Sequence, residues 1–515
     1  MPPLPVPGNR MRFRIAAAVV ALGFVFTTVS AQAAPAPTAV GSWSMVPMSK
    51  DTDGDGFIDG DGGVPTRGAL SAAPSPVFVG ADNFVAQPHE RLINGVLSWH
   101  LNPRGYPVRL DACSSSGDTY SWRVLSGTQV VTTTKAKPLT RKKCATTVML
   151  PEGRYRLELQ VRSGSSKDTA KLTANVDNIL FVAMGDSYAS GEGNPRNVDA
   201  FLVQGGAGFT PYWDSDDCNR SAHGAPAQAA LRLEESSPKT SVTLVYVACS
   251  GATVPAGILG AQRANGQTAS QVEQVAGIIG DRTIDVLTLS IGGNDVGFTS
   301  ILSACALARN CPLAKAPFGS LATFPTVQDG VQTRTAGLPA AFDRIARCFA
   351  GPACVLTDGR SVPPLKIANA GRVLPTLYPD ITRSAAGAPC TYLTITDTDF
   401  AWARDTMLTP STQNPFPYRT TQGTTVNLAT NAGTLNGTLL TTNRLGWSPA
   451  VGTWGASGES TVGRGVCAGA DAWFFGVTGL VGFTSGSFHP NPLGLQAMGK
   501  QIAAAVAGVL GTRLR

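Results

Sequence analysis

The sequence predicts an α/β protein in which a parallel β-sheet is covered by helices on both faces and is preceded by a small β-sandwich. Two observations support this prediction. From residue 178 onward, short apolar runs alternate with longer amphipathic stretches, which is typical of buried parallel strands and crossover helices. Between residues 64 and 177, apolar and polar residues alternate in short segments joined by Gly, Pro and Ser, as in antiparallel sheets.

Residues 1–33 have the features of a secretory signal peptide. Three arginines, the last of them Arg14, precede an apolar run over 15–29, and the small residues Ala31 and Ala33 follow at a cleavage-type site. The run is short for a membrane span, so we expect export rather than a retained anchor, and a secreted, extracellular mature protein.

The charge of the chain excludes some partners. The formal net charge is +7, and removal of the three arginines of the signal leaves 7 − 3 = +4. No basic block interleaved with aromatic residues is present, so we expect no nucleic-acid binding. A weak positive field favours an anionic surface such as lipid headgroups, with simple solubility as the alternative.

Ten cysteines in an exported chain predict disulfides, because exported proteins fold in oxidising compartments. Connectivity does not follow from sequence, but the spacing favours five local pairs. A metal site is a poor alternative, since no CxxC pair occurs and the four histidines are scattered. The pairs are Cys113 with Cys144, Cys218 with Cys249, Cys305 with Cys311, Cys348 with Cys354, and Cys390 with Cys467.

An acidic segment, DTDGDGFIDGDGG over 51–63, ends a predicted linker over residues 34–63. It resembles the calcium loop of an EF-hand, with Gly62 in place of the glutamate at the twelfth position. The resemblance implies a structural calcium ion; the alternative is a solvated acidic turn. The carboxylates that would converge on the cation are those of Asp51, Asp53, Asp55 and Asp59.

Residues 64–177 contain strand patterns such as TYSWRV (119–124) and YRLELQV (155–161). They resemble the immunoglobulin-like or PKD-like modules that accompany many secreted bacterial enzymes. For this module we expect a spacer role, or binding to a lipid or polysaccharide surface.

The region 178–515 is predicted to be the catalytic domain. A stretch rich in Thr, Asn, Gly and Trp over 400–465 shows no period and is interpreted as a long excursion over the active-site rim. The predicted strands are 179–184, 242–248, 285–291 and 372–378, and the predicted helices are 270–279, 338–349 and 492–510.

Ligands of open α/β sheets collect at the carboxyl ends of the strands, and polar or glycine-rich residues follow three of the predicted strands. The first strand ends in Gly185-Asp186-Ser187, the second leads to Gly251 and the third to Asn294. Far downstream, His489 precedes the last helix. A hydroxyl, an imidazole and fixed amide donors are the groups that acyl transfer requires.

The blocks GDSY, CSGAT, GGND and HPN, in this order, resemble the four sequence blocks of the SGNH (GDSL-like) hydrolases, in particular the secreted, disulfide-bonded actinobacterial lipases and esterases. The resemblance covers 179–515 and implies a three-layer α/β/α fold with a parallel sheet. It also implies a serine esterase or lipase, monomeric and without a cofactor for catalysis, that cleaves an acyl-ester lipid or a small ester. In such an enzyme Ser187 would be the nucleophile, Gly251 and Asn294 would join the amide of Ser187 as oxyanion donors, and His489 would be the base.

The sequence departs from the usual family pattern at one position. Many members have an aspartate three residues before the histidine, where this chain has Gly486. We therefore expect a main-chain carbonyl at or next to Gly486 to fix the imidazole, a carboxylate from elsewhere being the alternative. Asp186 and Asp295 are expected to stabilise their own turns.

The substrate is the least determined part of the prediction. The aromatic residues Trp473, Phe474, Phe475, Phe483 and Phe488 could line an acyl groove or belong to the core. A carbohydrate deacetylase is the alternative enzyme, and a non-catalytic surface-binding protein is the alternative of another class. The GxSxG signature of α/β-hydrolases is absent from the sequence.

Overall fold

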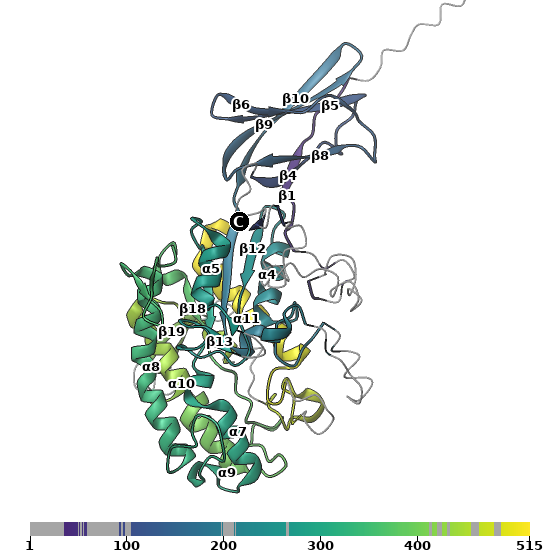
Figure 1. Ribbon diagram of the computed structural model, residues 1–515. Helices are drawn as coiled ribbons and strands as arrows, with labels where there is room; N and C mark the ends of the chain where they lie inside the picture. Colours follow the sequence, from purple (N-terminus) through teal and green to yellow (C-terminus); the bar gives the residue numbers. More distant parts are fainter. Residues whose placement is uncertain are drawn as a thin grey trace, which may run out of the picture.

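The fold is known from a computed structural model of the chain (Figure 1). It describes residues 36–49, 51, 54, 56–58, 92–93, 96–97, 105–196, 198, 211, 213–263, 267–410, 415–419, 425–429, 433–454, 463–477 and 486–514. The predicted signal segment, residues 1–33, lies outside these ranges.

Two antiparallel sheets form the first part of the described chain and share one apolar core. Alternate residues of the strands point inward, so that Val108, Trp122 and Leu159 are buried between the sheets. The three-stranded sheet has the order β1 (Ser42–Met45), β4 (Tyr106–Asp111), β8 (Ala145–Leu150). The other has the order β10 (Ser166–Val176), β9 (Gly153–Ser163), β5 (Thr119–Ser126), β6 (Gln129–Thr133), with β7 (Lys137–Pro138) paired to β5.

Strand β1 lies inside the segment 34–63 that we predicted to be a linker. It pairs with β4 along its whole length, and its Met45 belongs to the core between the two sheets. Four residues give too short an alternation to be recognised as a strand from sequence alone. Within the described part of 64–104, β2 (Leu92–Ile93) and β3 (Val96–Leu97) form an antiparallel pair.

A four-stranded parallel sheet organises the rest of the chain. Its order is β12 (Val242–Tyr246), β11 (Ile179–Gly185), β15 (Val286–Ser290), β18 (Val373–Pro375). The strands are buried throughout, which explains their continuous apolar sequences. The four strands coincide with the four predicted runs, each ending within a few residues of the expected position.

Long helices pack against this sheet (Figure 1). Helices α4 (Ala225–Glu235) and α11 (Pro492–Leu510) contact each other closely because Gly499 has no side chain; a Cβ atom there would lie 2.4 Å from Cβ of Gln228. The segment Pro492–Leu514 is long and apolar enough to cross a membrane, but α11 contributes core residues such as Leu495 and Val506. The other helices at the sheet include α5 (Gln271–Ile279) and α8 (Val327–Ala350).

The stretch 400–465 was predicted to be an irregular excursion, but its described part contains regular helices and a β-hairpin. It contains the end of α9 (Asp397–Ala403), a π-helical turn η6 (Arg404–Leu408), the hairpin β19 (Pro415–Arg419) and β20 (Thr425–Ala429), and α10 (Leu435–Leu440). These helices are too short for a 3.6-residue period to stand out, and α10 is buried on all sides.

The antiparallel and parallel parts meet through a polar junction. The amide of Met45 donates to the carbonyl oxygen of Pro238 over 2.9 Å. Lys239 donates its ammonium to the carbonyl oxygen of Trp43 and lies 3.7 Å from the centre of the Trp43 ring. Glu234, which is buried, accepts the amides of Met48 (2.9 Å) and Val242 (2.7 Å). These bonds tie β1 to α4 and β12.

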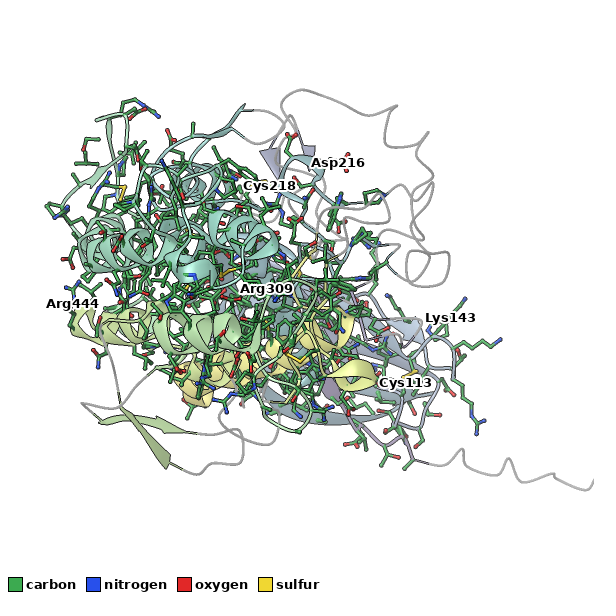
Figure 2. The ribbon with its side chains drawn as sticks, turned by 90° about the horizontal axis from the view of Figure 1, so that it is seen from below. Cys113, Lys143, Asp216, Cys218, Arg309 and Arg444 are labelled. Carbon is green, nitrogen blue, oxygen red and sulfur yellow. A yellow bond between two sulfur atoms is a disulfide. The ribbon has the colours of Figure 1, made fainter. Side chains whose placement is uncertain are left out.

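All ten cysteines are in disulfides, and the pairs are the five that the spacing favours. One lies in the antiparallel part and four lie in the parallel part. Cys218–Cys249 joins the loop before α4 to the end of β12, and Cys305–Cys311 closes a short loop at the end of α7 (Phe298–Leu307). Figure 2 shows the side chains from below, with Cys113 and Cys218 among those labelled.

Candidate active site

The candidate nucleophile, Ser187, follows the central strand β11. Gly185 ends this strand with a φ of 146°, and a Cβ atom there would lie 2.3 Å from the carbonyl oxygen of Ser290, so only glycine fits. Asp186 caps the short helix α2 (Ser187–Ser190) by accepting the amide of Tyr188 over 3.1 Å. The sharp change from strand to helix places Ser187 at the carboxyl edge of the sheet.

Ser187 and His489, 302 residues apart, form a hydrogen-bonded pair. The distance from Ser187 Oγ to His489 Nε2 is 2.8 Å, and His489 Nδ1 lies 2.9 Å from the carbonyl oxygen of Ser487. A carbonyl oxygen only accepts, so Nδ1 carries the proton and Nε2 accepts the hydroxyl proton of Ser187. Both side chains are buried, with 6% and 8% of their surface exposed.

The acceptor at Nδ1 is the carbonyl oxygen of Ser487, the residue next to Gly486, so the predicted main-chain carbonyl is present. The carbonyl oxygen of Gly486 instead accepts the main-chain amide of His489 over 2.9 Å, which closes a tight turn. Phe488 inside this turn has a φ of 61°, a left-handed conformation that few non-glycine residues adopt. This conformation aims the carbonyl of Ser487 back at the imidazole, a detail that sequence does not reveal.

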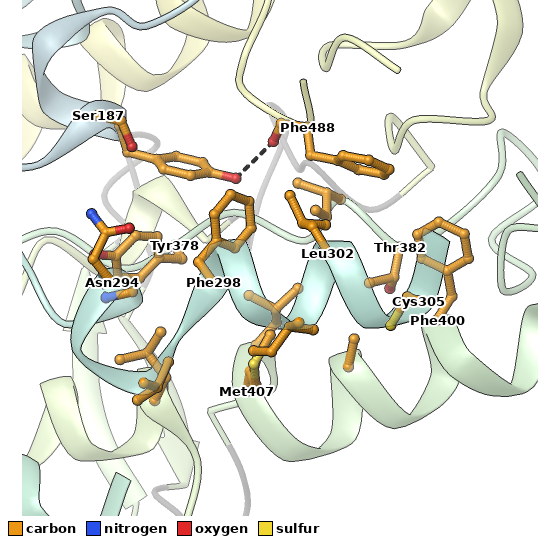
Figure 3. Close-up of a pocket in the computed structure, with 18 of the residues that line it drawn as sticks. Ser187, Asn294, Phe298, Leu302, Cys305, Tyr378, Thr382, Phe400, Met407 and Phe488 are labelled. Carbon is orange, nitrogen blue, oxygen red and sulfur yellow. Dashed lines mark hydrogen bonds between the residues drawn. The ribbon is translucent and has the colours of Figure 1, made fainter. Parts of the chain in front are cut away.

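Two buried side chains hold the histidine loop against the nucleophile. Tyr188, next to Ser187, donates its hydroxyl to the carbonyl oxygen of Phe488 over 2.8 Å, the bond drawn in Figure 3. Asn194 donates its amide to the carbonyl oxygen of Pro490 over 2.7 Å. The ring of Tyr188 also lies 5.0 Å from that of His489, centre to centre. The imidazole is therefore fixed by aromatic packing as well as by hydrogen bonds.

Burial is the main influence on the imidazole and lowers the pKa of His489 below its ordinary value. Two smaller effects raise the pKa of His489: the negative charge of Glu192 and the hydrogen bond to Ser487. Glu192 is itself buried, and its carboxylate accepts the side-chain amide of Asn219 at 3.0 and 3.1 Å. The histidine is therefore neutral at pH 7 and able to act as a base, with a carboxylate nearby that stabilises its protonated form.

Three amide groups at the predicted oxyanion positions have hydrogens that are free to donate. Within the described part of the chain, the main-chain amides of Ser187 and Gly251 donate to no protein acceptor. Asn294 donates one amide hydrogen to the carbonyl oxygen of Ala252 over 3.0 Å, which leaves its second hydrogen available. Figure 3 shows Asn294 beside Ser187. The role of these groups as oxyanion donors stays a prediction.

Asp186 forms the centre of a buried network that joins two loops of the site. Its carboxylate accepts the hydroxyls of Tyr378 and Ser290, and Tyr378 in turn accepts the amide of Gly293 over 2.9 Å. Burial raises the pKa of Asp186 to about 7, although these donors act in the opposite direction. The network fixes the Gly293-Asn294 loop relative to the turn that carries Ser187.

We expected Asp295 to stabilise only its own turn, but its carboxylate also binds a distant loop. Its two oxygens accept the amide of Val254 at 3.0 and 3.2 Å, so it joins the loop after β12 to the loop after β15. Burial raises the pKa of Asp295 to about 6. Asp186 does cap its own turn, as expected, but it also has the longer-range partners described above.

An apolar pocket begins at Ser187 and follows α7. Figure 3 shows Ser187 and Asn294 at one end and Cys305 and Phe400 at the other. Its wall comes from α7, α9, η6 and α10, which include part of the stretch that was predicted to pass over the rim. The apolar lining residues are Val296, Phe298, Ile301, Leu302, Cys305, Ile381, Ile395, Phe400, Ala403, Met407, Leu408, Leu435 and Phe488.

Of the aromatic candidates near the histidine, Phe488 lines this pocket and Phe474 is buried in the core. Phe483 lies outside the described residues. His223 is a buried packing residue. Its ring centre lies 4.0 Å from that of Phe57, and burial lowers the pKa of His223 to about 3. His89 and His100 are outside the described residues.

The predicted calcium loop is described only in part. Asp51 accepts the amides of Gly54 (2.6 Å) and Gly56 (2.9 Å), while Asp53, Asp55 and Asp59 lie outside the described residues. Among the residues that are described, no three His, Cys, Asp or Glu side chains form a group suited to a metal ion. The calcium site stays a prediction.

Sequence reasoning missed Tyr378, Tyr188 and Gln271. The buried side chain of Gln271 donates to the carbonyl oxygen of Gly185 (2.7 Å) and accepts the amide of Gly185 (2.8 Å), which holds the end of β11. Tyr188 follows the nucleophile directly and could have been suspected from that position. Tyr378 and Gln271 carried no comparable signal, since each is distant in sequence from the group it holds.

Comparisons with known proteins give only distant similarity. No known family profile matches the chain, and no curated protein sequence matches it. The crystal structure of a phospholipase A1 from Streptomyces albidoflavus NA297 is similar over 63% of this chain and 97% of that one, with 20% identity and a TM-score of 0.33. The structure of a carbohydrate esterase is similar over 46% of this chain and 67% of that one, with 11% identity and a TM-score of 0.19. The function is therefore argued from the site itself.

Proposed function

We propose that the protein is a carboxylic ester hydrolase that acts through a Ser187–His489 dyad and an acyl-enzyme intermediate. The observation that carries this proposal is the hydroxyl of Ser187, which donates to an unprotonated imidazole nitrogen at 2.8 Å while the other nitrogen is held by a carbonyl. A structural serine would have no need of a histidine in a fixed tautomer.

The reaction follows from this geometry. Ser187 Oγ attacks the ester carbonyl carbon as His489 Nε2 takes the hydroxyl proton. In the proposed reaction, the oxyanion that forms accepts hydrogen bonds from the amides of Ser187, Gly251 and Asn294. His489 then gives its proton to the leaving alkoxide, and the alcohol departs from the acyl-enzyme. A water molecule activated by the same imidazole releases the acid and restores Ser187.

The pocket supports an acyl chain of some length as the acid part of the substrate. Its side walls are almost entirely apolar, and burial of methylene groups there contributes about 0.8 kcal/mol for each. A lipid ester therefore fits better than an acetylated sugar, whose acetyl group would leave most of the pocket unused. We place the lipid tail along α7, between Ser187 and Phe400.

The proposed setting is extracellular. Five disulfides are formed in the structure, and disulfides persist in oxidising compartments. Together with the signal-type sequence over 1–33, this supports an exported enzyme that meets its ester substrate outside the cell.

The test is Ser187→Ala, assayed with p-nitrophenyl esters of increasing chain length. Turnover should fall by at least about a thousandfold, because the nucleophile is lost, while the thermal unfolding transition stays nearly unchanged. A phosphonate ester should label Ser187 in the unsubstituted protein. Ser190→Ala, on the same short helix, is the control and should keep its activity. Full activity in Ser187→Ala, or labelling of another serine, would refute the dyad.

A further inference from the structure

The three most exposed large apolar side chains among the described residues lie in one region, at the end of α7. Leu307, Leu393 and Leu313 have 73%, 64% and 63% of their surface exposed. Isolated exposed leucines need no explanation, but a group at one place on a surface often marks a contact with another apolar phase. The region also borders the proposed acyl pocket.

Covalent and hydrogen bonds hold these residues together. Leu307 is the last residue of α7, and the disulfide Cys305–Cys311 closes the loop that leads to Leu313. Thr394, next to Leu393, donates its hydroxyl to the carbonyl oxygen of Ala306 over 2.8 Å. The exposed leucines are therefore presented by a constrained scaffold and not by a loose loop.

The backbone at Leu393 is a second observation. Its φ of 55° lies in the left-handed region, which glycine adopts readily and leucine does not. Tyr392 and Ile395 exchange both main-chain hydrogen bonds around it, at 3.0 and 3.1 Å. A leucine at the tip of this turn neither packs inside the fold nor relaxes the backbone. Leu393 is therefore available for a contact outside the molecule.

The charge of the region indicates what the contact is. From Gly297 to Gln328 the sequence has two cations, Arg309 and Lys315, and no acidic residue. Both are exposed, and within the described residues neither forms an ion pair with an acid.

The nearby acidic groups belong to α8, α9 and η6. Asp329, in the first turn of α8, accepts the hydroxyl of Thr326 over 2.8 Å, and the amide of Val327 in the same turn donates to the carbonyl oxygen of Ala314, next to Lys315. Asp399 is buried and accepts the amide of Cys311, Asp397 accepts the amide of Thr398, and Asp405 pairs with Arg404. Exposed leucines interspersed with unpaired cations match the interface of an anionic lipid layer, where apolar side chains enter the acyl region and cations meet the phosphates.

We propose that Leu307, Arg309, Leu313, Lys315 and Leu393 form a docking surface for an anionic phospholipid layer; we call it the α7-end surface. The inference rests on the proposed function, because it supplies the ester from a lipid aggregate. Leu302 and Cys305 of α7 line the pocket while Leu307 faces solvent, so one helix connects the docked layer with the acyl site.

The position of the surface in the molecule agrees with this role. In Figure 1, α7 and α9 lie at the end of the molecule opposite the two antiparallel sheets, and Figure 2 views this end, with Arg309 labelled. Docking there would leave the antiparallel sheets pointing away from the lipid. The antiparallel module, which we expected to bind a surface, would therefore not contact this lipid layer.

The experiment measures co-sedimentation of the protein with vesicles of phosphatidylglycerol or phosphatidylcholine. All proteins carry Ser187→Ala, so that the vesicles are not hydrolysed. Arg309→Gln with Lys315→Gln should weaken binding to phosphatidylglycerol on the order of 25-fold, about fivefold for each cation. The control is Lys142→Gln with Lys143→Gln, an equal change of charge on the antiparallel part, which should leave binding unchanged. If both double variants lose vesicle binding equally, the effect comes from net charge alone and the proposal is overturned.

Two further variants separate docking from folding and from chemistry. Leu307→Ser with Leu313→Ser should also lose vesicle binding, whereas Val130→Ser with Val131→Ser, exposed on β6, should not. Leu393→Gly should weaken binding and yet unfold at the same or a higher temperature, because glycine relieves the left-handed backbone. Unchanged binding in these variants, or self-association through the leucines detected by analytical ultracentrifugation, would reject the lipid partner.

Hydrolysis of a soluble short-chain ester keeps the two proposals apart. With Ser187 restored, the surface variants should all retain this activity, since none of their residues lines the pocket. Absence of soluble-ester hydrolysis in the unsubstituted protein would refute the proposed function. If the protein hydrolyses the soluble ester normally but the surface variants bind vesicles as well as the unsubstituted surface does, only the docking surface is refuted.

Discussion

At the scale of single residues, the site depends on two tyrosines as much as on the residues that would react. Tyr378 joins the carboxylate of Asp186 to the amide of Gly293, and Tyr188 joins α2 to the histidine loop. Neither hydroxyl is placed to enter the reaction. Each holds a main-chain segment at the distance that the Ser187–His489 pair requires.

Replacing Tyr378 with Phe should lower kcat about ten- to a hundredfold with little change in KM, because Asn294, the proposed oxyanion donor, loses its support while the pocket keeps its shape. The pKa of Asp186 should rise above its present value of about 7, since the Tyr378 hydroxyl lowers it. Steady-state kinetics over a pH series measure both effects. Tyr155→Phe, which removes a comparable hydroxyl in the antiparallel part, is the control. A rise in KM alone would show that Tyr378 acts in binding.

The acid limb of kcat/KM should have its midpoint below pH 6.5, because burial lowers the pKa of His489 and only the neutral imidazole is a base. Glu192→Gln should move the limb to still lower pH, since the negative charge of Glu192 raises that pKa. A soluble ester assayed from about pH 4 to 8 gives the midpoint. Glu235→Gln, which changes an exposed glutamate on α4, should leave the midpoint of the acid limb unchanged. A shift toward higher pH in Glu192→Gln would contradict the electrostatic account.

The sequence identified the candidate catalytic residues better than the residues that position them. Ser187, Asn294 and His489 stand in short motifs next to strand or helix ends, so each could be found locally. Tyr378 lies 192 residues from Asp186 and 85 from Gly293, and nothing near it in sequence reports those partners. A main-chain carbonyl at or next to Gly486 was predicted to hold His489, but that the carbonyl is the one of Ser487 depends on the left-handed φ of Phe488, which sequence does not show.

At the scale of elements, buried parallel strands were the easiest part to predict, since burial on both faces gives continuous apolar runs. Helix α8 was predicted from residue 338 but begins at Val327. Pro339 lies inside it, and a proline with no amide to donate normally marks a helix boundary. The pocket could not be predicted, because its walls come from short helices brought together only by the fold.

The pocket gives a prediction at this scale. Leu302→Trp should fill it from α7 and reduce hydrolysis of long-chain esters at least tenfold, while acetyl and butyryl esters are cleaved at nearly the same rate. Thr299→Trp, on the exposed side of the same helix, tests for an effect of bulk alone. A p-nitrophenyl ester series measures both variants. An equal loss for all chain lengths would place the acyl chain elsewhere.

At the scale of the whole molecule, one buried carboxyl group links the antiparallel part to the parallel part. Burial raises the pKa of Glu234 to about 8 from an ordinary value of 4.5, against the amides that it accepts. The native protein therefore binds a proton that the unfolded chain releases between these two values. The resulting stabilisation is fully present at low pH and is lost as the pH rises through about 8.

Glu234→Gln should therefore flatten the dependence of stability on pH. The glutamine oxygen still accepts the amides of Met48 and Val242, but the group has no proton to lose. Denaturant unfolding at pH 5 and pH 9 should differ by several kcal/mol less than in the unsubstituted protein, at about 1.4 kcal/mol for each pKa unit. Glu235→Gln is the exposed control. An unchanged difference would assign the pH dependence to Asp186 and Asp295.

The connection between the two parts is short, and Arg513 holds it through two ion pairs. Strand β10 ends at Val176 and β11 begins at Ile179, so only two residues separate the last antiparallel strand from the central parallel one. The guanidinium of Arg513, at the far end of the chain, donates to Asp177 within this junction and to Asp285 beside it. The carboxyl-terminal segment thus cross-links the two-residue connection between the two parts, and we expect this cross-link to restrict rotation of the antiparallel sheets relative to the strand that carries Ser187.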